Sequence, residues 1–232
     1  VIKFDAYPEQ KREWIERLKQ AAPNNSLADY LSAADHLKQG RTEDAMSAFL
    51  TAASKTGFDD YTIHTIQSAE EMYTMAGRSP AEAKAIAGFQ MQLPHLKQLR
   101  DLGKEMAKMQ KQSQAAGDSD RAREMAATGL QMGRQMSMGE GGSYLINQLV
   151  GIAIERNVLD ALDPGAENSF LGRSLEELQR ELTDQKDEIA ALVKSVNLDQ
   201  MSEQEMTAYV DRMKLHGEFA SMKWFRDRQA NR

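Results

Sequence analysis

Apolar residues recur every three or four positions along most of the chain, which is the period of an amphipathic helix. Glycine, proline and short polar runs separate these segments, as they do at helix ends. The sequence holds no convincing alternating runs of β-branched residues flanked by hairpin turns, which would indicate strands. We therefore predict an all-α protein of about nine helices.

Three tetrapeptides that begin with serine mark helix starts. Residues 79–82 (SPAE), 174–177 (SLEE) and 202–205 (SEQE) each have serine at the cap and glutamate three residues later, which is the pattern of a capping box. Pro94 has no amide donor, so we expect it to separate the helix that starts at Pro80 from a second, leucine-rich helix.

Two long helices are predicted at the C-terminal end. Apolar residues repeat with heptad spacing from Leu175 to Val196, which predicts a helix with one apolar seam. The apolar pattern after Ser202 continues through Gly217 to Trp224, so we predict one unbroken final helix. The simplest arrangement pairs these two helices antiparallel.

Small residues share one face of the helix predicted over residues 120–138. Ala126, Gly129 and Gly133 are spaced three and four apart, which indicates that a neighbouring helix approaches this backbone closely. The glycine-rich residues 139–143 that follow are predicted to form a flexible loop.

The segment from Leu27 to Ala53 has the pattern of two short helices joined by a tight turn. Small and bulky residues stand at the positions where a tetratricopeptide helix pair needs them: Ala33, Gly40, Ala45, Phe49 and Ala52. Residues 25–57 therefore resemble one tetratricopeptide repeat. They lack the family's aromatic residue near Asp29 and its proline near Gly57, and no later segment repeats the signature. The resemblance implies a packed helical hairpin and names no ligand.

We predict two parts in the chain. Residues 1–115 are expected to form a tetratricopeptide-like array of antiparallel helix pairs, and residues 116–232 a helical bundle that ends in a helical hairpin. One continuous domain is the alternative, because 232 residues with 41% apolar content suffice for a single elongated core.

Composition limits the function classes. With 35 acidic and 29 basic residues the net charge is −6, so we expect no nucleic-acid partner. The absence of cysteine excludes disulfides, thiolate catalysis and cysteine-ligated metal sites. No apolar stretch approaches the roughly 20 residues of a membrane-spanning helix, so no transmembrane segment is expected within the chain.

The sequence leaves the cellular location open between two interpretations. The chain begins at Val1 rather than methionine, so we expect that residues upstream were removed. Either those residues were a secretory signal or membrane anchor, or Val1 marks an arbitrary boundary. Residues 24–30 (NNSLADY), 57–61 (GFDDY) and 149–153 (LVGIA) resemble stretches in uncharacterised exported helical proteins of bacteria. That resemblance implies a location in the cell envelope and names no activity.

Known catalytic motifs are absent from the sequence. None of the four histidines follows a glutamate by three residues, and no Gly-x-Ser-x-Gly or Gly-Lys-Ser/Thr motif occurs. Asp60 and His64 share a helix face, which permits a local pair but adds no nucleophile. The 14 methionines more simply fill the core or an adaptable surface than bind Cu(I). We therefore assign no catalytic, cofactor or metal residue.

The role we predict is that of a non-catalytic protein interaction module. A groove beside the first hairpin, bordered by Tyr30, Tyr61 and His64, is expected to bind a peptide or helix of a partner protein. Trp224 and Phe225, within a basic C-terminal segment, form a second candidate surface for an acidic partner or an anionic membrane.

The sequence leaves two alternative functions open. The first is a small-molecule or metal-binding helical protein, or an enzyme with an unrecognised motif, that uses a pocket around Tyr61, His64 and the methionine-rich helices. The second is a self-associating structural protein whose seam is the heptad of residues 175–196.

Overall fold

The protein is described by a computed structural model for residues 7–138, 144–164 and 169–230. The predicted loop at 139–143 lies outside these residues. Within them the chain is helical and contains no strand, which confirms the all-α prediction; one isolated backbone bridge joins Asn25 and Gly57. The α-helices are α1 (Lys11–Ala21), α2 (Leu27–Lys38), α3 (Thr42–Ser54), α4 (Thr62–Met75), α5 (Pro80–Phe89), α6 (Pro94–Ala115), α7 (Ser119–Met138), α8 (Leu145–Leu159), α9 (Leu175–Ser195), α10 (Glu203–His216) and α11 (Glu218–Ala230). Short 3-10 helices occupy Pro8–Gln10, Ser169–Leu171 and Leu198–Gln200.

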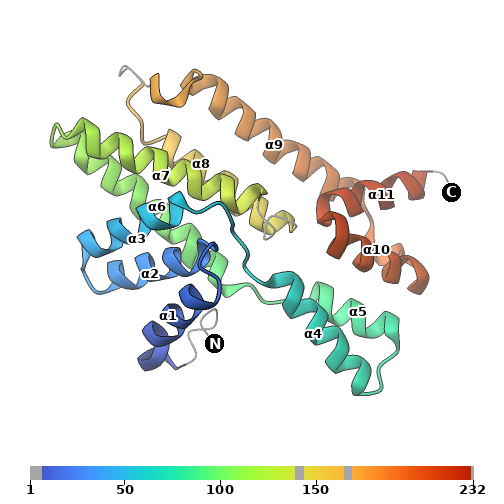
Figure 1. Cartoon of the computed structure of the whole chain (residues 1–232). Coiled ribbons are helices and arrows are strands. Elements are labelled where there is room, and N and C mark those ends of the chain that lie inside the picture. The colour runs from blue at the N-terminus through green and yellow to red at the C-terminus, as the bar shows by residue number, and fades with distance from the viewer. Residues whose placement is uncertain (1–6, 139–143, 165–168, 231–232) are drawn as a thin grey trace.

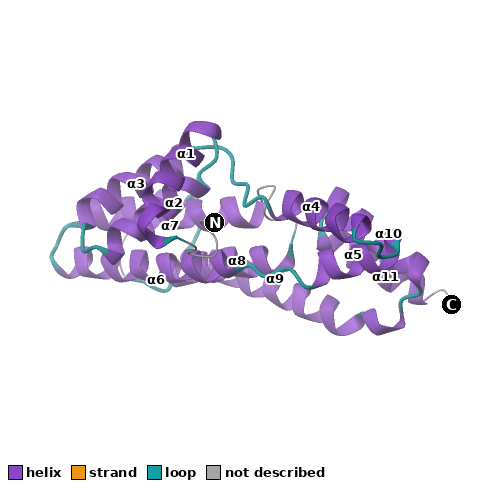
Figure 2. Ribbon diagram, turned by 90° about the horizontal axis from the view of Figure 1, so that it is seen from below, coloured by secondary structure: helices purple, strands orange, loops and turns teal. Residues whose placement is uncertain are grey.

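The helices form an elongated molecule with two apolar cores (Figures 1 and 2). The first core lies among α1, α2, α3 and α6, and the second among α4, α5, α9, α10 and α11. The two central helices α7 and α8 place residues in both cores. The apolar interior therefore extends across both of the parts predicted from the sequence, and the predicted boundary falls at the end of α6, which packs on α7.

Local sequence signals set most helix ends. All three capping boxes are present, with the serine hydroxyl accepting from the glutamate N–H and the glutamate carboxylate accepting from the serine N–H: Ser79 with Glu82, Ser174 with Glu177, and Ser202 with Glu205. The break before Pro94 is confirmed, because α5 ends at Phe89 and α6 begins at Pro94.

The prediction of one unbroken final helix is wrong. Gly217 has φ +82°, a left-handed conformation that ends α10, and α11 begins at the next residue. Only part of the predicted pairing with α9 is present, since α11 packs on α9 while α10 packs on α5. The heptad seam of α9 is partly buried within the same chain through Leu182, Ile189 and Leu192.

Paired charges hold α10 against α4 and α5. Lys84 of α5 contacts Glu70 of α4 at 2.9 Å and Asp211 of α10. Lys214 of α10 contacts Glu70 at 2.8 Å and Asp211 at 3.1 Å. The partly buried ion pairs alternate in sign around a ring, which gives each carboxylate two cations.

The central helices α7 and α8 approach each other at glycine. A β-carbon added to Gly133 would lie 2.3 Å from Glu155 Cγ and 2.8 Å from the Gly151 carbonyl oxygen. Gly151 in turn faces Ser137 and the Gly133 carbonyl. The close helix approach predicted from the small residues of α7 is therefore confirmed.

Among the described residues, no helix combines the length and the apolar character needed to cross a bilayer.

Candidate functional site

A surface groove runs between the α2–α3 hairpin and α6, and we call it the α2–α6 groove. Its volume is about 510 Å³, and its lining residues on α6 extend from Lys97 to Gln112. At 1.5 Å per residue these positions span about 22 Å along the helix. The groove is therefore long enough for several residues of a bound peptide.

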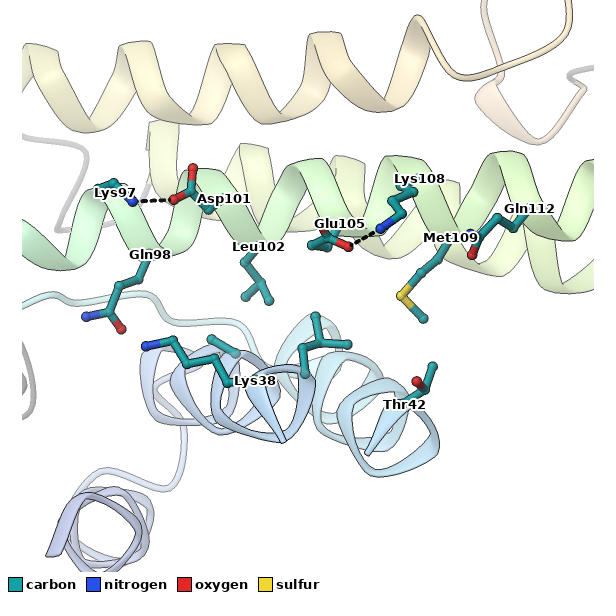
Figure 3. Close-up of a pocket in the computed structure, with 12 residues that line it drawn as sticks. Lys38, Thr42, Lys97, Gln98, Asp101, Leu102, Glu105, Lys108, Met109 and Gln112 are labelled. Carbon is teal, nitrogen blue, oxygen red and sulfur yellow. Dashed lines mark hydrogen bonds and ion pairs between the residues drawn. The ribbon is translucent and has the colours of Figure 1, made fainter. Parts of the chain in front are cut away.

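The groove has an apolar floor and polar edges (Figure 3). Leu102 and Met109 point from α6 toward the hairpin, and Ala34 and Leu37 of α2 line the opposite side. The edges carry Lys38, Thr42, Lys97, Gln98, Asp101, Glu105, Lys108 and Gln112. Apolar anchors surrounded by polar edges are typical of sites that bind a helix or an extended peptide.

The four charged side chains of α6 that line the groove form two pairs. Lys97 Nζ donates to Asp101 Oδ2 at 2.8 Å, and Lys108 Nζ lies 3.3 Å from Glu105 Oε2 (Figure 3). The hydrogen bond from Lys97 and the charges of Arg100 and Lys104 hold the pKa of the Asp101 carboxyl below its ordinary value. Asp101 therefore remains ionised, and the edge can pair with polar groups of a ligand.

Tyr30 does not border this groove. Its side chain is fully buried in the first core, and its hydroxyl donates to Gln135 Oε1 of α7 at 2.7 Å. Burial raises the pKa of the Tyr30 hydroxyl, so the group stays neutral. The predicted partner-binding residue is thus a core residue in this structure and offers no surface to a partner.

Tyr61 and His64 lie together at the start of α4. Their ring centroids are 6.0 Å apart, with Tyr61 half-buried and His64 exposed. Tyr61 lines a different, shallow hollow of about 570 Å³ with residues 22–25 and 56–59. The structure therefore has a groove beside the first hairpin, but Tyr30, Tyr61 and His64 do not line it. That this groove binds a partner stays a prediction.

Trp224 and Phe225 differ in their exposure to solvent. Phe225 is fully buried in the second core, edge-on to Tyr209 at 6.5 Å between centroids. Trp224 is half-buried beneath the chain's own cations, with the guanidinium of Arg212 5.0 Å and that of Arg228 6.0 Å from its ring. Only part of Trp224 faces solvent, and Phe225 serves the core.

A buried polar junction lies where the linker after α3 crosses between α6 and α8. His95 Nε2 is 2.8 Å from Asp60 Oδ2, and Asn147 Nδ2 donates to the same oxygen at 3.1 Å. The other Asp60 oxygen accepts from the Thr62 N–H at 3.0 Å, and Asp60, His95 and Asn147 are fully buried. The sequence permits a local pair between Asp60 and His64, and the structure shows a buried contact of Asp60 with His95.

The junction has the chemistry of a structural support. The preceding residue of the linker is also anchored, because Asn25 Nδ2 donates to the Asp59 carbonyl at 2.7 Å and Asn25 Oδ1 accepts from the Asp59 N–H at 3.1 Å. No nucleophile joins the Asp60 contacts described above, and the three polar side chains lie out of reach of solvent. Over the described ranges, no group of three histidine, aspartate or glutamate side chains could hold a metal ion.

Glu155 is a buried carboxyl group between the central helices. Burial raises its pKa from 4.5 to about 7, with a further increase from Glu181 and an opposing effect of Arg134, whose Nε is 3.7 Å away. The folded protein therefore binds this proton more tightly than the unfolded chain. The contribution of Glu155 to stability is therefore most favourable below about pH 4.5, falls as the pH rises toward 7, and stays lower above 7.

Replacing Glu155 by glutamine removes this pH-dependent cost. We expect the Glu155→Gln variant to gain up to about 3 kcal/mol of unfolding free energy relative to the native chain at pH 8, and little at pH 4.5. Urea unfolding at the two pH values measures the difference. Glu176→Gln, at an exposed position of α9, is the control, and an equal effect of both substitutions at both pH values would contradict the assignment.

Comparison with protein-family models, with curated proteins and with solved structures gave no match to this chain.

Proposed function

We propose that the protein is a non-catalytic helical scaffold that binds a peptide or helix of a partner protein in the α2–α6 groove. The observation that carries the proposal is a groove between two helices remote in sequence, whose lining spans about 22 Å along α6 and whose floor is apolar, with Leu102 and Met109 facing Ala34 and Leu37. Methionine and leucine side chains on this floor can adapt to apolar anchors, and the paired charges at the edge can orient them.

The proposal makes Thr42 a sensitive position. Thr42 is exposed at the first residue of α3 and lines the groove, so tryptophan there fills the space without removing a core atom. The matched control is Gln67→Trp on the exposed surface of α4, which lies outside the groove.

The experiment first identifies the occupant and then tests the groove. A photo-crosslinking residue at Thr42 or Gln98, expressed in the native cells, should capture one protein that the same residue at Gln67 does not capture. The captured protein is then purified and titrated against the full chain. Thr42→Trp should weaken binding by about tenfold or more, or about 1.4 kcal/mol, with an unchanged unfolding midpoint.

Two results would overturn the proposal. One is equal capture from Thr42, Gln98 and Gln67, which indicates contact without a defined groove. The other is unchanged affinity of the Thr42→Trp variant for the captured protein, which places its binding surface elsewhere.

A further inference from the structure

The helices α6 and α9 carry the largest opposite charges of the described α-helices. The α6 helix contains five lysine or arginine and two acidic residues, for a net charge of +3. The α9 helix contains six acidic and three basic residues, for a net charge of −3. Each of the other α-helices lies between −2 and +2. The contrast is therefore specific to these two elements.

The cations of α6 form a continuous ridge. They are spaced three or four residues apart, which places them on one face of the helix, at Lys97, Arg100, Lys104, Lys108 and Lys111. All five are exposed, and Lys111 has no ion pair within the described part of the chain. Two carboxylates on the same helix cannot neutralise five cations, so the ridge keeps a positive field.

The exposed face of α9 is its acidic counterpart. Only Leu182, Ile189 and Leu192 of its 21 residues are buried, against the body of the molecule. Asp184 and Asp187 are exposed, and no ion pair with either is formed among the residues that the structure describes. A helix that binds its own chain along a narrow apolar stripe leaves most of its acidic surface open.

The two helices also match in place and length. They have 22 and 21 residues, or about 33 and about 32 Å. Both pack against α8, and α6, α8 and α9 run along the same lower edge of the molecule in Figure 2. A groove of about 470 Å³ between α6 and α8 is lined by Lys104, Lys108 and Lys111 on one side and by Asn157 and Asp160 on the other.

We propose that a second copy of this chain docks on this edge, with α6 of each copy against α9 of the other. A two-fold axis that runs between α6 and α9 along their length brings the basic ridge of one copy over the acidic face of its partner, and repeats the contact by symmetry. The seam differs from the heptad expected from the sequence, because the apolar residues of that heptad serve the chain's own core. Ion pairs between exposed side chains are weak and screened by salt, so the dimer should be salt-sensitive.

Charge reversal with rescue tests this arrangement. One variant carries Lys104→Glu with Lys111→Glu, and the other carries Asp184→Lys with Asp187→Lys. Neither pair lines the α2–α6 groove, so the dimer and the proposed partner site can fail independently. Arg17→Glu with Arg78→Glu, at exposed positions on α1 and before α5, changes the net charge as much as the α6 variant and serves as the control.

Sedimentation velocity of the full chain over a concentration series gives the readout. We expect a dimer at about 0.05 M salt whose dissociation constant rises tenfold or more at about 1 M salt and in either double variant, but not in the control. An equimolar mixture of the two variants should restore a dimer, because each then supplies the charge that the other lacks. Three results would overturn the proposal: a native chain that stays monomeric at low salt, a dimer insensitive to both variants, or a mixture that stays monomeric. The first result would leave an acidic segment of another protein as the candidate occupant of the basic ridge.

Discussion

Replacing Asp60 by alanine is expected to lower the free energy of unfolding by about 3–5 kcal/mol. The substitution removes the oxygen shared by His95 Nε2 and Asn147 Nδ2 and the acceptor of the Thr62 N–H. Bulk water does not reach these groups, because Asp60, His95 and Asn147 are fully buried. Buried polar groups that lose their partner cost far more than the net gain of an ordinary hydrogen bond.

The neighbouring Asp59→Ala substitution is the control for this prediction. The Asp59 carboxylate accepts from the Tyr61 N–H at 2.7 Å, and the residue is only half-buried, so its loss should cost about 1 kcal/mol. Urea unfolding of Asp59→Ala, Asp60→Ala and Asp60→Asn measures how much stability each carboxylate contributes. Asparagine keeps an oxygen of similar position, and we expect it to retain part of the stability. Equal losses in Asp59→Ala and Asp60→Ala would contradict a structural role for the junction.

The sequence predicts the parts of this fold that depend on neighbouring residues. A capping box needs only four consecutive residues, and all three were predicted at their observed positions. Gly217 was missed because the apolar period of 3.6 continues across it, while its positive φ redirects the chain without disturbing the pattern. Tyr30 was assigned to the surface, although its spacing of three residues from Leu27 on the same buried helix face was a signal for the core.

The long-range features could not be predicted from one sequence. Asp60 meets His95 and Asn147 across 35 and 87 residues, and no local pattern specifies which polar residues meet at such separations. The α2–α6 groove has the same origin, since its second wall begins about sixty residues after the first. A groove beside the hairpin was predicted, but the identity of its lining residues depends on how α6 packs.

A methyl group at Gly133 tests the packing of the central helices. The added β-carbon would lie 2.3 Å from Glu155 Cγ and 2.8 Å from the Gly151 carbonyl oxygen. The glutamate side chain can move, but the carbonyl belongs to the facing backbone, so α7 and α8 must separate. Alanine is more favourable than glycine in a helix by about 1 kcal/mol, which offsets part of this cost. We therefore expect Gly133→Ala to lower the free energy of unfolding by about 2 kcal/mol.

The matched substitution is Gly88→Ala, because Gly88 is also a buried helical glycine but the nearest atom to its added β-carbon is Met213 Cε at 3.4 Å. There the helix preference is gained without a backbone clash, so this variant should be neutral or more stable by up to about 1 kcal/mol.

Adding Glu155→Ala to Gly133→Ala relieves only the contact with the side chain. The double variant should therefore be more stable than additive effects of the two substitutions predict, yet remain below Glu155→Ala alone. Should Gly133→Ala unfold at the same urea concentration as the native chain, the close backbone contact between α7 and α8 would be absent, and with it the burial that raises the pKa of Glu155.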